Sequence, residues 1–314
     1  MPRHATALVA ALLAGAACFS GMACFGGLAD AAPATPDAST KPAPGASKPE
    51  SPKAEKPEPV ILANHKAVYD LSLASSGGTR SVESARGRIV IDFKGDACRG
   101  YTMQTRQVTV LESGESGGRT SDLRNTTFEG GDARDFRFRT VTVLNGQPSP
   151  AVDGTADANG DAFKIRLKEP KKEQVSSAGP VLFPSLHMRR LVQAARAGET
   201  TMSAKVFDGS DDGRKIYDTL AVIGRRATAP ANAAASDRDK PLHEGMMAGV
   251  PHWPVTLSYF TQGEGERTPI YTLTFDLYEN GVSGALKLDY GDFAILGDLT
   301  RLELDKVPDK TCAP

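Results

Sequence analysis

The sequence has little that would mark a catalyst, a nucleic-acid binder or a metalloprotein. Its formal net charge is −1 over 314 residues, so it lacks the basic excess that would hold nucleic acid or an anionic membrane surface. The five histidines include no His-x-His or His-x-x-x-His pair, which argues against a zinc site. Gly-x-Ser-x-Gly, Walker and Gly-x-Gly-x-x-Gly motifs are also missing. We therefore expect no enzymatic activity, no cofactor and no metal site.

Long hydrophobic runs are scarce, and the main one lies at the N-terminus. Arg3 and His4 precede an apolar stretch at 5–17, and small residues follow at Ala29–Ala31. This order is typical of a secretory signal peptide with an Ala-x-Ala cleavage site, so we expect residues 1–32 to be removed during export. A retained membrane helix is the alternative, but Gly and Ala weaken the second half of the segment.

Cysteine is rare, with four residues in the chain. Cys18 and Cys24 lie in the predicted signal peptide and are candidates for lipidation. We do not favour lipidation, because the position three residues before each cysteine holds glycine, where lipoprotein signals usually have leucine. Cys98 and Cys312 remain after processing, and two cysteines in an exported protein suggest a disulfide. Two free thiols are the alternative.

Proline is concentrated in one segment. Residues 33–59 hold eight of the 21 prolines, interleaved with Ala, Lys, Glu and Ser. Such a segment has too little apolar surface to fold, so we expect an extended, disordered tether. The remaining residues, 60–314, are numerous enough to bury one sizeable core, and we expect a single domain.

Alternation of apolar and polar residues dominates this domain. Its most regular part is 271–305, where Asn280-Gly281 separates two alternating runs and supplies the backbone angles of a tight hairpin turn. Similar short runs recur about every ten to fifteen residues from His65 onward, with turn residues between them. The pattern predicts an all-β fold with minor α, built largely of antiparallel strands.

One helix is expected, with Ser185 as its N-cap and Gly198 just after its end. The apolar residues of one helical face should lie on the sheet, namely Met188, Leu191, Val192 and Ala195. Arg189 and Arg190 fall largely off this face. We interpret them as solvent-facing, with a partner or ligand surface as the alternative.

Two further features have both a functional and a plainer interpretation. The stretch 208–213 (DGSDDG) matches the first half of a calcium loop, but the twelfth position is Thr219 instead of a carboxylate. We therefore favour a hairpin turn. Trp253, the single tryptophan, lies between two prolines. It is either the rim of an apolar ligand site or a residue that caps the core, and we favour the second.

Several longer strings resemble a known family. They are Leu182–Pro184, Ala194–Thr201 and Val206–Tyr217, together with Leu277–Ser283 and Leu288–Phe293 near the C-terminus. These strings look like the EipB family of cell-envelope integrity proteins, over roughly His65 to Cys312. The tether at 33–59 and the loop at 225–242 depart from the family pattern.

The resemblance implies a periplasmic protein of Gram-negative bacteria. It also implies a large antiparallel sheet curled into a spiral or partly open barrel, with one main helix packed inside the curl. The family has a disulfide between an early strand and the C-terminus, which falls on Cys98 and Cys312 here. It has no assigned catalytic residues, so none are expected in this chain.

We therefore expect a non-enzymatic periplasmic protein that supports cell-envelope integrity. The first hypothesis is docking to another envelope protein, for which the resemblance suggests a tetratricopeptide-repeat partner, through the open edges of the sheet. The alternative is a carrier or sensor of an apolar envelope component, a lipid or glycolipid, held inside the curl. An apolar cavity would favour the carrier, and a filled polar interior would favour docking.

Overall fold

The computed structural model describes residues 58–77, 82–114, 117–228, 238–263 and 267–305. The predicted signal peptide, nearly all of the predicted tether, and Cys18, Cys24 and Cys312 lie outside these ranges. No helix within them is long and apolar enough to cross a membrane.

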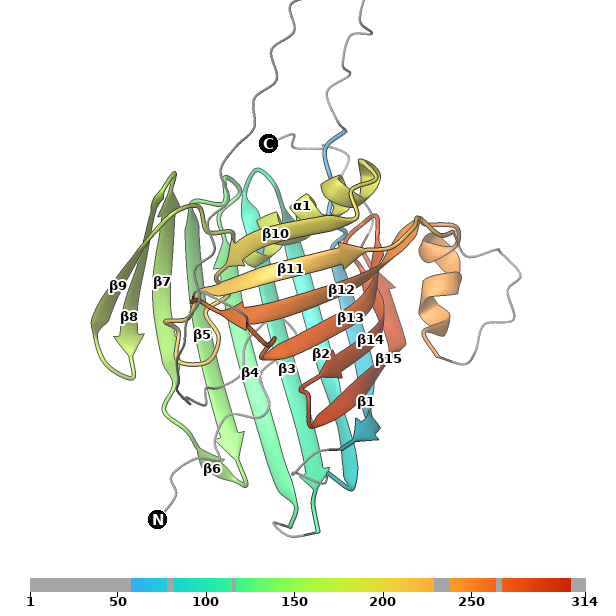
Figure 1. Cartoon of the computed structure of the whole chain (residues 1–314), viewed down its shortest axis with the longest axis horizontal. Coiled ribbons are helices and arrows are strands. Elements are labelled where there is room, and N and C mark those ends of the chain that lie inside the picture. Colours follow the sequence, from blue (N-terminus) through green and yellow to red (C-terminus); the bar gives the residue numbers. More distant parts are fainter. Residues whose placement is uncertain (1–57, 78–81, 115–116, 229–237, 264–266, 306–314) are drawn as a thin grey trace, which may run out of the picture. The chain divides into compact units, whose positions relative to one another are not determined.

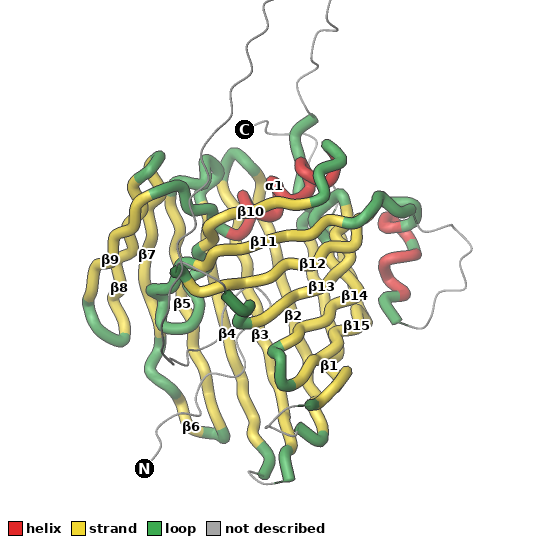
Figure 2. The backbone as a smooth tube through the Cα atoms, in the orientation of Figure 1, coloured by secondary structure: helices red, strands yellow, loops and turns green. Residues whose placement is uncertain are grey.

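Strands make up most of the described chain (Figures 1 and 2). The strands are β1 His65–Ser76, β2 Ser84–Asp96, β3 Gly100–Glu112, β4 Arg119–Glu129, β5 Asp135–Leu144, β6 Gln147–Pro148, β7 Val152–Asn159, β8 Ala162–Glu169, β9 Glu173–Ala178, β10 Thr201–Val206, β11 Tyr217–Ile223, β12 His252–Thr261, β13 Tyr271–Tyr278, β14 Ser283–Asp289 and β15 Phe293–Leu304. The helices are α1 Pro184–Arg196 and two short 3-10 turns, η1 Lys240–His243 and η2 Gly245–Met247.

All of these strands belong to one antiparallel sheet that does not close into a barrel. Its order is β10-β11-β12-β13-β14-β15-β1-β2-β3-β4-β5-β7-β8-β9, with β6 paired to β5. The first strand therefore lies in the middle of the sheet, beside the last one. In Figure 1 the strands β10 to β13 cross in front of the long strands β2 to β5, which shows how far the sheet turns back on itself. The predicted fold class is confirmed.

Alternating sequence patterns produce these strands as expected. In β13 every second side chain is buried, from Tyr271 to Leu277. The hairpin to β14 turns at Asn280-Gly281, where Gly281 has a φ of 82° and its N–H donates to the carbonyl of Tyr278. A residue with a side chain is strained at this φ, so glycine suits position 281. Asn280 does not have the positive φ that the expected turn needs, and it acts through its side chain instead, whose Oδ1 accepts the N–H of Val282 at 3.2 Å.

Two apolar clusters hold the curl together. The larger one joins β1 to β3 with β11 to β15 and includes the inner face of α1. The smaller one joins β5, β7 and β8 with the segment before α1 and the loop after β10. In that cluster Phe207, from the loop, meets the rings of Phe138 and Phe163 edge-on, each at a centroid distance of 5.4 Å. Side-chain packing therefore joins the strands β5, β7 and β8 to the loop after β10.

Helix α1 begins two residues earlier than predicted. Phe183 is the N-cap residue, Pro184 opens the helix, and Ser185 lies within its first turn. The expectation of Ser185 as N-cap was wrong. Proline suits the first helical position, and the side chain of Glu129, on β4, accepts the N–H groups at the start of the helix. Gly198, with a φ of 76°, ends the helix as predicted. The predicted apolar face of α1 packs on the larger cluster.

Candidate functional site

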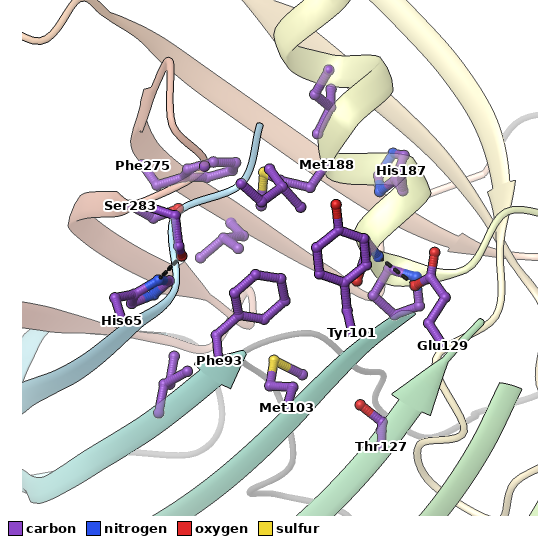
Figure 3. Close-up of a pocket in the computed structure, with 18 of the residues that line it drawn as sticks. His65, Phe93, Tyr101, Met103, Thr127, Glu129, His187, Met188, Phe275 and Ser283 are labelled. Atoms are coloured by element: carbon purple, nitrogen blue, oxygen red, sulfur yellow. Dashed lines mark hydrogen bonds between the residues drawn. The ribbon is translucent and has the colours of Figure 1, made fainter. Parts of the chain in front are cut away.

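A cavity of about 110 Å³ lies inside the curl of the sheet, against α1 (Figure 3). Its walls come from both halves of the sheet, β1 to β5 on one side and β12 to β14 on the other. An engineered cavity of roughly 150 Å³ in another protein binds benzene, whereas sites for drug-sized ligands measure about 300–1,000 Å³. This cavity therefore has room for a single ring or the tip of a chain, and not for a whole lipid.

Most of the cavity wall is apolar. Phe93 and Met103 project from the long strands, Phe275 from β13 and Met188 from α1, and all four are labelled in Figure 3. Methionine side chains adapt to ligands of different shape, because they are unbranched and polarizable. The cavity thus offers a largely apolar, deformable surface for an apolar group.

Glu129 is the buried acid of this site, at the end of β4 with 2% of its surface exposed. Its carboxylate oxygens accept hydrogen bonds from the backbone N–H of Ser185 (2.6 Å) and of Leu186 (2.8 Å). Glu129 therefore caps the start of α1 from a strand more than fifty residues earlier, and the positive end of the helix favours its charge. Burial disfavours the charged form more strongly than these hydrogen bonds favour it, so the pKa of Glu129 is raised to about 7.

His187 stands on the same first turn of α1 and is 5% exposed. Its Nε2 atom is buried and has no hydrogen-bond partner. Burial lowers the pKa of His187 to about 4, so the imidazole is neutral at pH 7. A buried nitrogen without a partner costs free energy, which makes His187 an unfilled polar position in a largely apolar wall.

The two arginines that we singled out do not share a surface. Arg190 is exposed, whereas Arg189 is only 6% exposed. The guanidinium of Arg189 lies 5.8 Å from the ring centroid of Tyr101, a cation–π contact beside the cavity. The expectation of a solvent-facing Arg189 was wrong, because Tyr101 and the charge of Glu129 give this cation partners inside the curl.

Trp253 is buried in the larger cluster, at 3% exposure, which is the core position that we favoured. It does not line the cavity. Cys98 lies in the turn after β2, where its N–H donates to Asp96 Oδ1 at 2.9 Å. Because Cys312 lies outside the described residues, the disulfide between them stays a prediction.

The stretch 208–213 forms the loop between β10 and β11. Asp208 points inward and is 4% exposed, and its Oδ1 accepts the N–H of Ser210 at 3.0 Å. Burial raises the pKa of Asp208 to about 7. Within the described ranges no group of three or more His, Cys, Asp or Glu side chains is arranged to hold a metal ion.

Comparisons with known proteins agree with this architecture. Residues 56–306 match the family described as EipB-like. The chain belongs to the EipB-like family. A curated relative, the cell envelope integrity protein EipB of Brucella abortus (strain 2308), is 34% identical over 246 residues, which cover 78% of this chain and 85% of the relative.

A solved structure supports the same assignment. The crystal structure of a beta-barrel-like protein with a domain of unknown function, also from Brucella abortus, superposes with a TM-score of 0.72 at 34% identity. The match covers 79% of this chain and all of that one. The EipB-like fold thus extends over nearly all of the described residues.

Glu129 and His187 are the two functional candidates that the sequence analysis missed. His187 was considered only as a zinc ligand, for which it has no neighbouring histidine. Glu129 occupies an inward position of β4, in line with Leu123 and Thr127, which are buried as well. A charged residue at an inward position of an alternating strand was the signal available in the sequence.

Proposed function

We propose that this EipB-like protein is a non-enzymatic periplasmic protein that supports cell-envelope integrity by holding the apolar end of an envelope component inside its curled sheet. The envelope role is supported by the name of the relative from Brucella abortus. The carrier or sensor mechanism is supported by one observation above all, the largely apolar cavity between the two halves of the sheet. Its small volume limits the bound part to a ring or a chain end, with the rest of the component outside.

A cavity-filling variant tests this proposal. Met188→Phe adds volume from α1 into the cavity, so it should reduce retention of envelope lipids measured by native mass spectrometry. Met202→Phe is the matched control, because Met202 on β10 is also partly buried against the larger cluster but does not line the cavity. Equal retention in both variants, or no retained lipid in the unchanged protein, would exclude the carrier mechanism.

A second candidate, docking to another envelope protein, is favoured by the open edge at β9. Among the residues that the structure describes, this strand pairs only with β8, and its side chains are largely exposed. An unpaired edge can add a strand from a partner, and a tetratricopeptide-repeat protein is the partner class that family resemblance suggests.

Site-specific photocrosslinking in cells tests the docking candidate. A photoreactive residue at Ser176, exposed on β9, should capture a specific envelope protein. The same residue at Gln104, exposed on the interior strand β3, is the control. The same proteins captured from both positions would count against docking at the edge.

A further inference from the structure

The polar side chains in the cavity wall limit the classes of ligand that can bind there. Cavity walls made only of apolar groups would accept any chain or ring of suitable size. Here the lining also contains polar side chains, and among these lining residues His187 is the one with a buried side-chain atom, Nε2, that has no hydrogen-bond partner. A buried polar group that is left without a partner discriminates strongly against ligands that cannot bond to it.

The neighbouring carboxyl group sets the charge that the ligand can carry. Both oxygens of Glu129 are already bonded to the backbone at the start of α1. The buried cation Arg189 lowers the pKa of Glu129 and so offsets this acid, but it does not line the cavity and gives an entering ion no partner there. Burying a charged ligand group of either sign would therefore be costly. The ligand part that enters should therefore be uncharged.

The imidazole itself selects the type of polar group. A neutral histidine has one nitrogen that donates a proton and one that accepts. A hydroxyl group can both donate and accept, so it matches Nε2 in either tautomer, whereas an ether or a carbonyl matches only one. We infer that the cavity binds an apolar chain or ring that carries an uncharged hydroxyl group, with the hydroxyl bonded to His187 Nε2. This inference rests on the proposed carrier function and adds the class of ligand.

Phenol and benzene form a matched pair of probes for this site. Both are in the size range of the cavity, phenol is uncharged at pH 7, and they differ by one hydroxyl group. The methyl groups of Met103 and Met188, which line the cavity, report binding through 13C-methyl NMR titrations of the protein. The quantity of interest is the Kd of benzene divided by the Kd of phenol.

Replacing the imidazole should change this ratio. His187→Leu keeps a similar volume but removes the nitrogen, so the ratio should fall by about tenfold relative to the unchanged protein. His187→Gln keeps a hydrogen-bonding group and should preserve most of the preference. In the unchanged protein, phenol but not benzene should shift the 15N resonance of His187 Nε2, a measurement that needs no variant.

The outcomes distinguish a failure of the carrier function from a failure of the hydroxyl preference. If neither probe binds the unchanged protein, the carrier function and the hydroxyl preference both fail. If both probes bind but the ratio is the same with His187 and with leucine, or the Nε2 resonance responds equally to both probes, the hydroxyl preference is wrong and the apolar cavity stands.

Discussion

Replacing Glu129 by glutamine should change how stability depends on pH. Burial raises the pKa of Glu129 from 4.5 to about 7, although the two N–H donors at the start of α1 favour the charged form. Between these two pH values the folded protein binds more protons than the unfolded chain. The contribution of Glu129 is therefore fully present below pH 4.5 and is lost as the pH rises through 7.

The magnitude follows from the size of the pKa change. A rise from 4.5 to about 7 corresponds to about 3 kcal/mol of unfolding free energy lost between pH 4.5 and pH 8. The amide of Glu129→Gln is neutral at every pH and, like a protonated acid, still offers one oxygen to the helix. The variant should exceed the stability of the unchanged protein by less than about 1 kcal/mol at pH 5 and by about 3 kcal/mol at pH 8.

Urea unfolding at pH 5, 6, 7 and 8, followed by circular dichroism, measures this difference. Asp208 and His187 have perturbed pKa values too, but they titrate in both proteins and cancel in the comparison. Glu129→Ala is the control for the cap. It does not titrate either, but it leaves both N–H groups without their acceptor, so it should be less stable than Glu129→Gln by about 2 kcal/mol or more at every pH. Parallel pH profiles for the unchanged protein and Glu129→Gln would refute the reasoning.

Three further predictions test other parts of the structure. His187→Leu removes an unpartnered buried imidazole, so the Tm should rise by about 2–4 °C in a thermal scan, and a fall would show that the imidazole has a structural partner. Gly209→Ala should cost about 2 kcal/mol or more in urea unfolding, because φ is 73° and the new Cβ would lie 2.4 Å from a phenylalanine ring. Gly146→Ala, with a φ of 77° and open space, should cost only about 1 kcal/mol. Cys98→Ser and Cys312→Ser should each remove up to about 5 kcal/mol, and the double variant should equal either one, because the predicted bond closes a loop of about 214 residues. Alkylation of both thiols in protein purified without reductant would contradict that bond.

Alternation was a sufficient guide to most strands. β13, β14 and β15 follow the predicted meander at 271–305, because one face of each strand is buried and a shift by one residue would expose it. The order of the strands in the sheet could not be predicted in this way. Periodicity does not show that β15 pairs with β1, and the curl of the sheet was expected from family resemblance alone.

The candidate site was harder to predict, for a physical reason. A helical wheel treats Arg189 as polar and therefore exposed, but its partners come from β3 and β4, far away in sequence. The same holds for Ser185, whose N–H is bonded by Glu129 instead of by a neighbouring cap. Local patterns describe each element by itself, whereas this site exists only where the ends of several elements meet.

The pairing of β1 with β15 has a consequence for the order of folding. Thr300 Oγ1 donates a hydrogen bond to the carbonyl of Val68 across 232 positions of the chain, and the two strands pair along most of their length. The centre of the sheet therefore forms only after almost the entire chain is available. Contacts between such distant residues slow folding, because the long loop between them must close first. A chain of this topology completes its core only once its last strand, β15, is available to pair with β1.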